Sequence, residues 1–168
     1  MAIKHGFIAE MQHEAAGTRR ILERLPLDKN DWQPHEKSMK LGNLANHVAE
    51  LPGWATMVMG TDELDLSKMD YKPVIPTNTE EWLAKLDTHV AKAVAALENS
   101  SDEEFEKPWT LRFGETVHFT MPKKVVLRNL AYNHLYHHRG QLGVYLRLLN
   151  VPVPGIYGPS ADERVQPK

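Results

Sequence analysis

Four stretches of the chain carry apolar residues at the three-to-four-residue spacing of an amphipathic α-helix, and this periodicity constrains the fold more than any other feature. The stretches predict helices over residues 3–25, 41–59, 79–98 and 122–150. Pro52 lies inside the second stretch and predicts a kink or a one-turn irregularity there, because proline removes a backbone donor and its ring clashes with the preceding turn. Four long amphipathic helices in one chain favour an all-α four-helix bundle.

The segments between the helices predict one hairpin and two loops. Residues 107–122 contain two runs in which apolar and polar residues alternate, separated by Gly114 and Glu115, and this pattern is typical of a short β-hairpin between helices three and four. Residues 26–39 and 60–78 are polar and contain helix-breaking residues, so we expect loops there. The proline-rich tail from about residue 151 predicts irregular structure, and residues 1–168 are of a length that suits one domain.

Composition excludes several classes of function. The formal net charge is only −2 and basic residues do not cluster, so we expect neither nucleic-acid nor membrane-surface binding. No stretch approaches the roughly 18 apolar residues of a membrane span, and residues 1–20 lack the apolar core of a secretory signal. The chain has no cysteine, which excludes disulfides, cysteine-based zinc sites and a thiol nucleophile of its own. A cytoplasmic protein is the expectation.

Three histidines occupy positions where the periodicity calls for apolar side chains. Stepping by threes and fours from Leu127 places His134 and His138 on the bundle-facing side of the fourth helix, and His47 has the same placement in the second. Burying a polar side chain without a partner costs about 1–3 kcal/mol, so three imidazoles in one core require a shared partner. Residues four apart share a helix face, and a divalent metal with three histidine ligands and an open fourth position satisfies all three.

Two competing interpretations of these histidines are weaker. His137 is also one turn from His134, but it lies about 100° around the helix from His138, and we assign it to the flank of the site. A di-iron bundle requires Glu-x-x-His on two helices. The spacing occurs at residues 10–13, on a predicted helix, and at residues 115–118, which fall in the predicted hairpin. The second occurrence argues against a di-iron site.

With these positions in view, the chain resembles the DinB/YfiT-like superfamily of metal-binding four-helix bundles. The resemblance rests on "LGNLANHVAELPGW" in the second helix, "HLYHHRGQLGVYL" in the fourth and "VPVPGIYGPSADE" in the tail. It implies that His47, His134 and His138 bind a divalent cation, commonly nickel or zinc. Water or substrate then takes the remaining position.

The resemblance also draws attention to residues beside the three histidines. Gln141 matches the glutamine of the motif and is expected to hydrogen-bond a bound water or ligand, or else to serve as a core amide paired with backbone. Glu50 follows His47 by three residues and is expected to orient that imidazole, or else to be a solvated helix-face carboxylate. Tyr136 and Arg139 point away from the bundle-facing side, and we assign them no chemical role.

The resemblance favours thiol chemistry over hydrolysis, because members of the superfamily include transferases and isomerases that use low-molecular-weight thiols such as bacillithiol and mycothiol. An open metal position can lower the pKa of a bound water or bind a thiol as thiolate. We therefore predict a metal-dependent S-transferase, or a related hydrolase or isomerase, that acts on a small molecule. We also expect a homodimer, as is common in the superfamily.

Two other interpretations stay open. In one, the protein is a non-catalytic, stress-related metal-binding bundle in which His5, His13 or Glu14 of the first helix completes the coordination of the ion. In the other, the protein is a metal-free interaction bundle with hydrogen-bonded core histidines.

Overall fold

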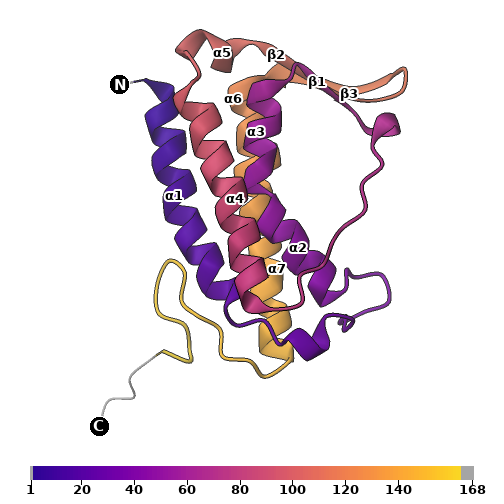
Figure 1. Ribbon diagram of the computed structural model, residues 1–168, viewed down its shortest axis with the longest axis vertical. Coiled ribbons are helices and arrows are strands. Elements are labelled where there is room, and N and C mark those ends of the chain that lie inside the picture. Colours follow the sequence, from indigo (N-terminus) through magenta and orange to yellow (C-terminus); the bar gives the residue numbers. More distant parts are fainter. Residues whose placement is uncertain (1, 164–168) are drawn as a thin grey trace.

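The computed structural model, which describes residues 2–163, is a helical bundle with a small sheet at one end (Figure 1). The first and third predicted helices are α1 (Ile3–Leu22) and α4 (Thr79–Glu98). The second is divided into α2 (Leu41–Glu50) and α3 (Pro52–Gly60). The fourth comprises α6 (Lys123–Val126), a π-helical segment η3 (Leu127–Asn133) and α7 (His134–Leu148). The predicted all-α four-helix bundle is confirmed.

Local chemistry explains where the helices begin and break. The Asn78 side chain accepts a hydrogen bond from the Glu81 backbone N–H at 2.9 Å, and the Glu81 carboxylate accepts one from the Thr77 N–H. This reciprocal capping begins α4 at the predicted residue. The irregularity predicted at Pro52 is present: α2 ends at Glu50, Leu51 keeps helical angles, and Pro52 begins α3. The first helix ends at Leu22 and not at residue 25.

The sheet combines the predicted hairpin with a strand that the sequence did not indicate. Strands β2 (Pro108–Phe113) and β3 (Thr116–Pro122) pair antiparallel around a turn at Gly114, whose φ of 55° suits a glycine. Strand β1 (Glu63–Asp65) pairs parallel with β2. Three further short helices are η1 (Leu27–Lys29), η2 (Leu66–Lys68) and α5 (Asp102–Glu106). The prediction of plain loop is therefore wrong at η1 within residues 26–39, and at β1 and η2 within residues 60–78.

The connection between α3 and α4 determines what covers one side of the bundle. Figure 1 shows that α3 ends near the sheet whereas α4 begins at the opposite end of the bundle, so the chain must return along the outside. Residues 61–78 make this return, and we call them the crossover segment. Tyr71 of the crossover segment donates a hydrogen bond to Glu50 of α2, which holds the segment against the bundle.

The buried apolar side chains of residues 2–163 form two hydrophobic clusters. One surrounds Leu44, Trp82 and Leu142, and the other surrounds Phe105 and Tyr132. Three partly buried side chains pack against both clusters: Trp54, Val90 and Tyr136. Along the fourth helix, the change from one cluster to the other falls between Tyr132 and Leu135, which places His134 at the boundary.

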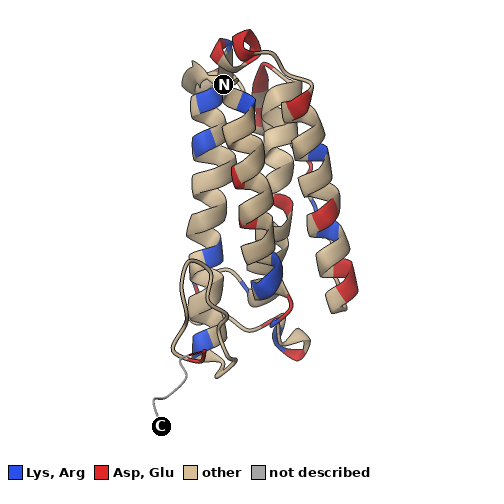
Figure 2. Ribbon diagram, turned by 90° about the vertical axis from the view of Figure 1, so that its left-hand side faces the viewer, with Lys and Arg blue, Asp and Glu red and all other residues tan. Residues whose placement is uncertain are grey.

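The remaining surface features bear on the sequence predictions. Residues 151–163 form neither helix nor strand, as predicted for the tail, whose residues 164–168 lie outside the described part. Among the described residues, no helix combines the length and the apolar character needed to cross a membrane. Figure 2 shows basic and acidic residues interspersed along the helices of the face in view, so that neither sign of charge dominates it.

Candidate metal centre

Three histidines from two helices converge between α2 and α7. His47 comes from α2, and His134 and His138 come from α7. One ring nitrogen from each can be chosen so that all three lie within 4.8 Å of one another. The Nε2 atoms of His47 and His134 are 3.1 Å apart. The structure thus brings together the three residues that the sequence singled out, and all three are half-buried.

Helix geometry explains how the two α7 histidines reach this position. They are four residues apart in a regular α-helix, so they share the face that packs against α2. Directly before His134, the wider turns of η3 accommodate an extra residue. Ala131 and Tyr132 are both buried there, and the Tyr132 hydroxyl donates a hydrogen bond to the Phe7 carbonyl at 2.7 Å. A π-helical segment is a frequent neighbour of functional sites.

The three-histidine donor set and the spacing of His47 and His134 suit a divalent cation. Zinc–nitrogen bonds of about 2.0–2.1 Å in a tetrahedral site place two ligand nitrogens about 3.3 Å apart, close to the separation seen between His47 and His134. Burial first, and then the neighbouring His134 and His138, lower the pKa of His47 from 6.5 to about 4. Burial also lowers the pKa values of His134 and His138. The rings are therefore neutral at pH 7, the form that binds a metal.

Gln141 supports the site through His138. Its Oε1 atom is 2.7 Å from Nδ1 of His138, and its Nε2 atom is 3.0 Å from Nε2 of His137. If Gln141 accepts a hydrogen bond from Nδ1–H of His138, the Nε2 lone pair of that ring is left free for an ion. The structure thus pairs Gln141 with two histidines and not with backbone. His137 is exposed and contacts the site through this amide and through its own ring, whose centroid is 4.8 Å from that of His138.

Glu50 belongs to a polar cluster beside His47. Its carboxylate accepts hydrogen bonds from the Tyr71 hydroxyl at 2.5 Å and from Lys85 Nζ at 3.0 Å, and none of its hydrogen bonds within residues 2–163 reaches His47. Burial opposes ionisation of Glu50, but these hydrogen bonds and the Lys85 charge leave its pKa lowered. Burial and Glu50 raise the pKa of Tyr71 to about 12. The Glu50 carboxylate therefore acts on His47 through its charge, which opposes the fall in that histidine's pKa.

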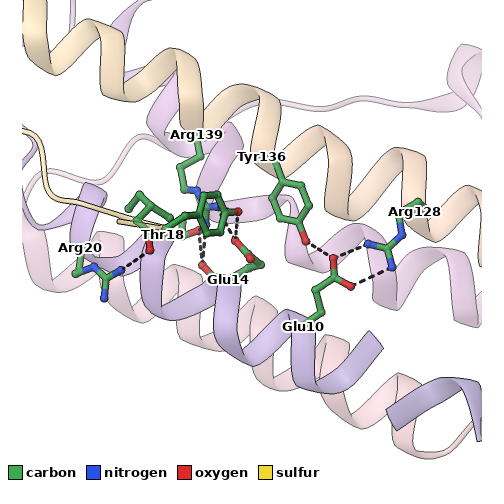
Figure 3. Close-up of polar contacts among 9 residues, drawn as sticks. Glu10, Glu14, Thr18, Arg20, Arg128, Tyr136 and Arg139 are labelled. Carbon is green, nitrogen blue, oxygen red and sulfur yellow. Dashed lines mark hydrogen bonds and ion pairs between the residues drawn. The ribbon is translucent and has the colours of Figure 1, made fainter. Parts of the chain in front are cut away.

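Neither the contact of Tyr71 with Glu50 nor the buried contacts of α1 could be predicted from the sequence. Figure 3 shows Glu14 of α1 facing Arg139, and Glu10 facing both Tyr136 and Arg128. Arg139, to which we assigned no chemical role, is only 4% exposed and binds α7 to α1. Each partner of these contacts is more than 100 residues away along the chain, a separation that periodicity cannot detect.

The first helix supplies no fourth ligand in this structure. The Glu14 carboxylate accepts hydrogen bonds from Arg139 at 2.5 Å and from the Tyr157 hydroxyl at 2.7 Å, while His5 and His13 are exposed. Within residues 2–163, the metal-binding group consists of the three histidines alone. A site with three protein ligands keeps a coordination position for water or substrate, as catalytic zinc sites do.

Comparison with known proteins agrees with this architecture. The chain is 27% identical over 161 residues to the uncharacterised protein YrdA of Bacillus subtilis, covering 94% of this chain and 89% of YrdA. A DinB-like protein from Bacillus cereus superposes with a TM-score of 0.69 at 24% identity, over 91% of this chain and 97% of that one. The DinB-like protein YjoA from Bacillus subtilis gives 0.66 at 19% identity, over 86% and 94%. The DinB family model matches residues 2–168, so the chain belongs to the DinB family.

Proposed function

We propose that this protein is a metal-dependent enzyme that joins a low-molecular-weight thiol to a small electrophile, with nickel or zinc held by His47, His134 and His138. The observation that supports this most strongly is the convergence of three neutral imidazoles without a fourth protein ligand among the described residues. When bound there, a divalent cation supplies Lewis acidity that lowers the pKa of a thiol. A chain without cysteine must take its sulfur nucleophile from a cosubstrate.

The surrounding residues have separate tasks in this proposal. Gln141 holds the His138 ring in one orientation through Nδ1. Burial keeps His47 in the neutral form near pH 7. The raised pKa of Tyr71 keeps its hydroxyl protonated, so that it remains a hydrogen-bond donor toward Glu50. Trp54 stands edge-on to the His134 ring, with centroids 5.7 Å apart, and places an apolar ring beside it.

A thiol-depletion assay tests the activity. Protein loaded with nickel or zinc is mixed with bacillithiol, mycothiol or glutathione and an electrophile such as monochlorobimane, and thiol loss is followed against metal-free protein. We expect metal-dependent loss that disappears in His47→Ala and persists in His118→Ala, which changes an exposed histidine of β3. An ester offered without thiol tests hydrolysis in parallel.

Three outcomes separate the alternatives. Thiol loss supports the transferase. Ester cleavage without thiol consumption replaces it with a hydrolase. Stable metal binding with neither reaction favours the non-catalytic metal-binding bundle. The homodimer and the cytoplasmic location stay predictions.

A further inference from the structure

A cavity of about 300 Å³ opens beside His47, between the helices and the crossover segment. Its apolar wall is built from three parts of the chain: Trp54 and Met57 on α3, Leu64 on β1, and Met69 after η2. Because His47 lines the same cavity, a molecule that coordinates an ion at the three histidines has this space beside it. The cavity therefore adjoins the candidate metal centre through His47.

The polar groups of the cavity are already paired with one another. Glu50 and Tyr71 are its polar side chains besides His47, and the Tyr71 hydroxyl donates to the Glu50 carboxylate. Lys85 donates to Glu50 and also to Asn46 and to the Val74 carbonyl, so the donors of its ammonium group are all used by protein acceptors. A polar ligand would have to displace these hydrogen bonds, whereas an apolar ligand leaves them intact.

Charge and volume restrict the ligand further. Within the described part of the chain, the lining contains no Lys or Arg, and its one carboxylate, Glu50, is paired with Lys85 at 3.0 Å, so an anionic group in the cavity would lose its water without gaining a cationic partner. A cavity of about 150 Å³ lined by apolar side chains holds benzene, so a space of this size accommodates one aromatic ring with substituents, or a branched alkyl group. Natural low-molecular-weight thiols are polar molecules, and the apolar wall of this cavity suits them poorly.

We propose that this cavity binds the uncharged apolar part of the electrophilic cosubstrate, a small aromatic or branched-aliphatic group, while the thiol approaches from the open side of the metal. The identification of the bound group as part of a cosubstrate rests on the proposed function. The binding of an apolar group to the cavity does not depend on the metal and is measured separately.

The methionines of the chain provide the readout. Met57 and Met69 line the cavity, and Met39 does not. Protein labelled with ¹³C at the methionine methyl groups is titrated, free of metal, with straight-chain alcohols of increasing length. We expect the Met57 and Met69 signals to shift and the Met39 signal to stay fixed. Affinity rises about fourfold for each added methylene, until the chain exceeds the cavity.

A matched pair of variants locates the binding. Met69 and Met39 are exposed to similar extents, 46% and 43%, so Met69→Glu and Met39→Glu place a carboxylate at comparable surface positions. We expect Met69→Glu to weaken alcohol binding at least tenfold and Met39→Glu to leave it unchanged. An alkyl carboxylate should bind wild-type protein at least tenfold more weakly than the alcohol of the same length.

Several results overturn the proposal: an affinity that does not change with chain length, equal effects of the two variants, or tight binding of the carboxylate. If the affinity for alcohols rises with chain length but the protein binds no metal, the cavity is an apolar binding site and the proposed enzyme activity is refuted. If thiol consumption depends on the metal but its kcat/KM does not change with the size of the electrophile, the enzyme activity is supported and the role of the cavity is refuted.

Discussion

Replacing Arg139 by methionine should destabilise the protein strongly, because it leaves a carboxylate buried without its cation. Arg139 and Glu14 are 4% and 5% exposed. The Arg139 guanidinium donates to the Glu14 carboxylate at 2.5 Å, to the Glu14 carbonyl at 3.0 Å, to Thr18 Oγ1 at 3.2 Å and to the Tyr157 hydroxyl at 2.6 Å. Removing one member of such a buried pair lowers the free energy of unfolding by about 3–5 kcal/mol.

A double-mutant cycle separates the ion pair from the packing of its side chains. Glu14→Met should also be strongly destabilising, whereas the double variant Glu14→Met with Arg139→Met should recover most of the loss, because an apolar pair of similar volume leaves no buried charge. Arg147→Met is the control, since Arg147 and Asp162 form a more exposed ion pair whose removal should cost at most about 1 kcal/mol. Urea unfolding of metal-free protein at pH 7 measures all four variants. The reasoning is refuted if Arg139→Met costs no more than Arg147→Met, or if the two single losses simply add in the double variant.

Three further outcomes follow from the site and its surroundings. Gln141→Ala should weaken metal binding about 10- to 100-fold in a chelator competition, because His138 loses the partner of its Nδ1, while the unfolding of metal-free protein changes little. The folded-state pKa of His47, about 4, lies below its unfolded value of 6.5, so the unfolded chain alone takes up this proton between those pH values. The free energy of unfolding of metal-free protein should therefore fall as the pH drops through that window, by at most about 3 kcal/mol for this group, and His47→Leu should flatten the dependence measured by urea unfolding. In Gly53→Ala the new Cβ would collide with the His89 ring, so we expect a loss of about 1–3 kcal/mol in thermal or urea unfolding, and a markedly smaller loss in a His89→Ala background.

The parts of the fold that could be predicted are those governed by local rules. Apolar periodicity located the helices, and the polar residues around Asn78 placed the start of α4 correctly. Strand β1 could not be predicted, because three residues carry no measurable period and its partner β2 lies more than 40 residues further along the chain. The π-helical segment η3 could not be predicted either, since its sequence is compatible with an ordinary α-helix and its wider turns depend on how Ala131 and Tyr132 pack.

The same distinction applies to the candidate site. His134, His138 and Gln141 lie three and four residues apart on one helix, so spacing alone predicts that they are neighbours. His47 is on another helix, but its bundle-facing position indicated a place in the same core. Tyr71 could not be found in this way, because it lies in an irregular part of the crossover segment and reaches Glu50 only through the tertiary path of the chain.

Metal content is the most direct test of the central claim that three histidines form one metal site. Untagged wild-type protein, incubated with nickel or zinc and desalted, is compared by elemental mass spectrometry with His47→Ala, His134→Ala, His138→Ala and the exposed-site control His118→Ala. We expect about one ion per chain in wild type and control, and loss of the ion in each of the other three variants while circular dichroism shows an intact helical fold. Wild-type protein without metal after incubation, or full metal retention in any of the three variants, would contradict the account.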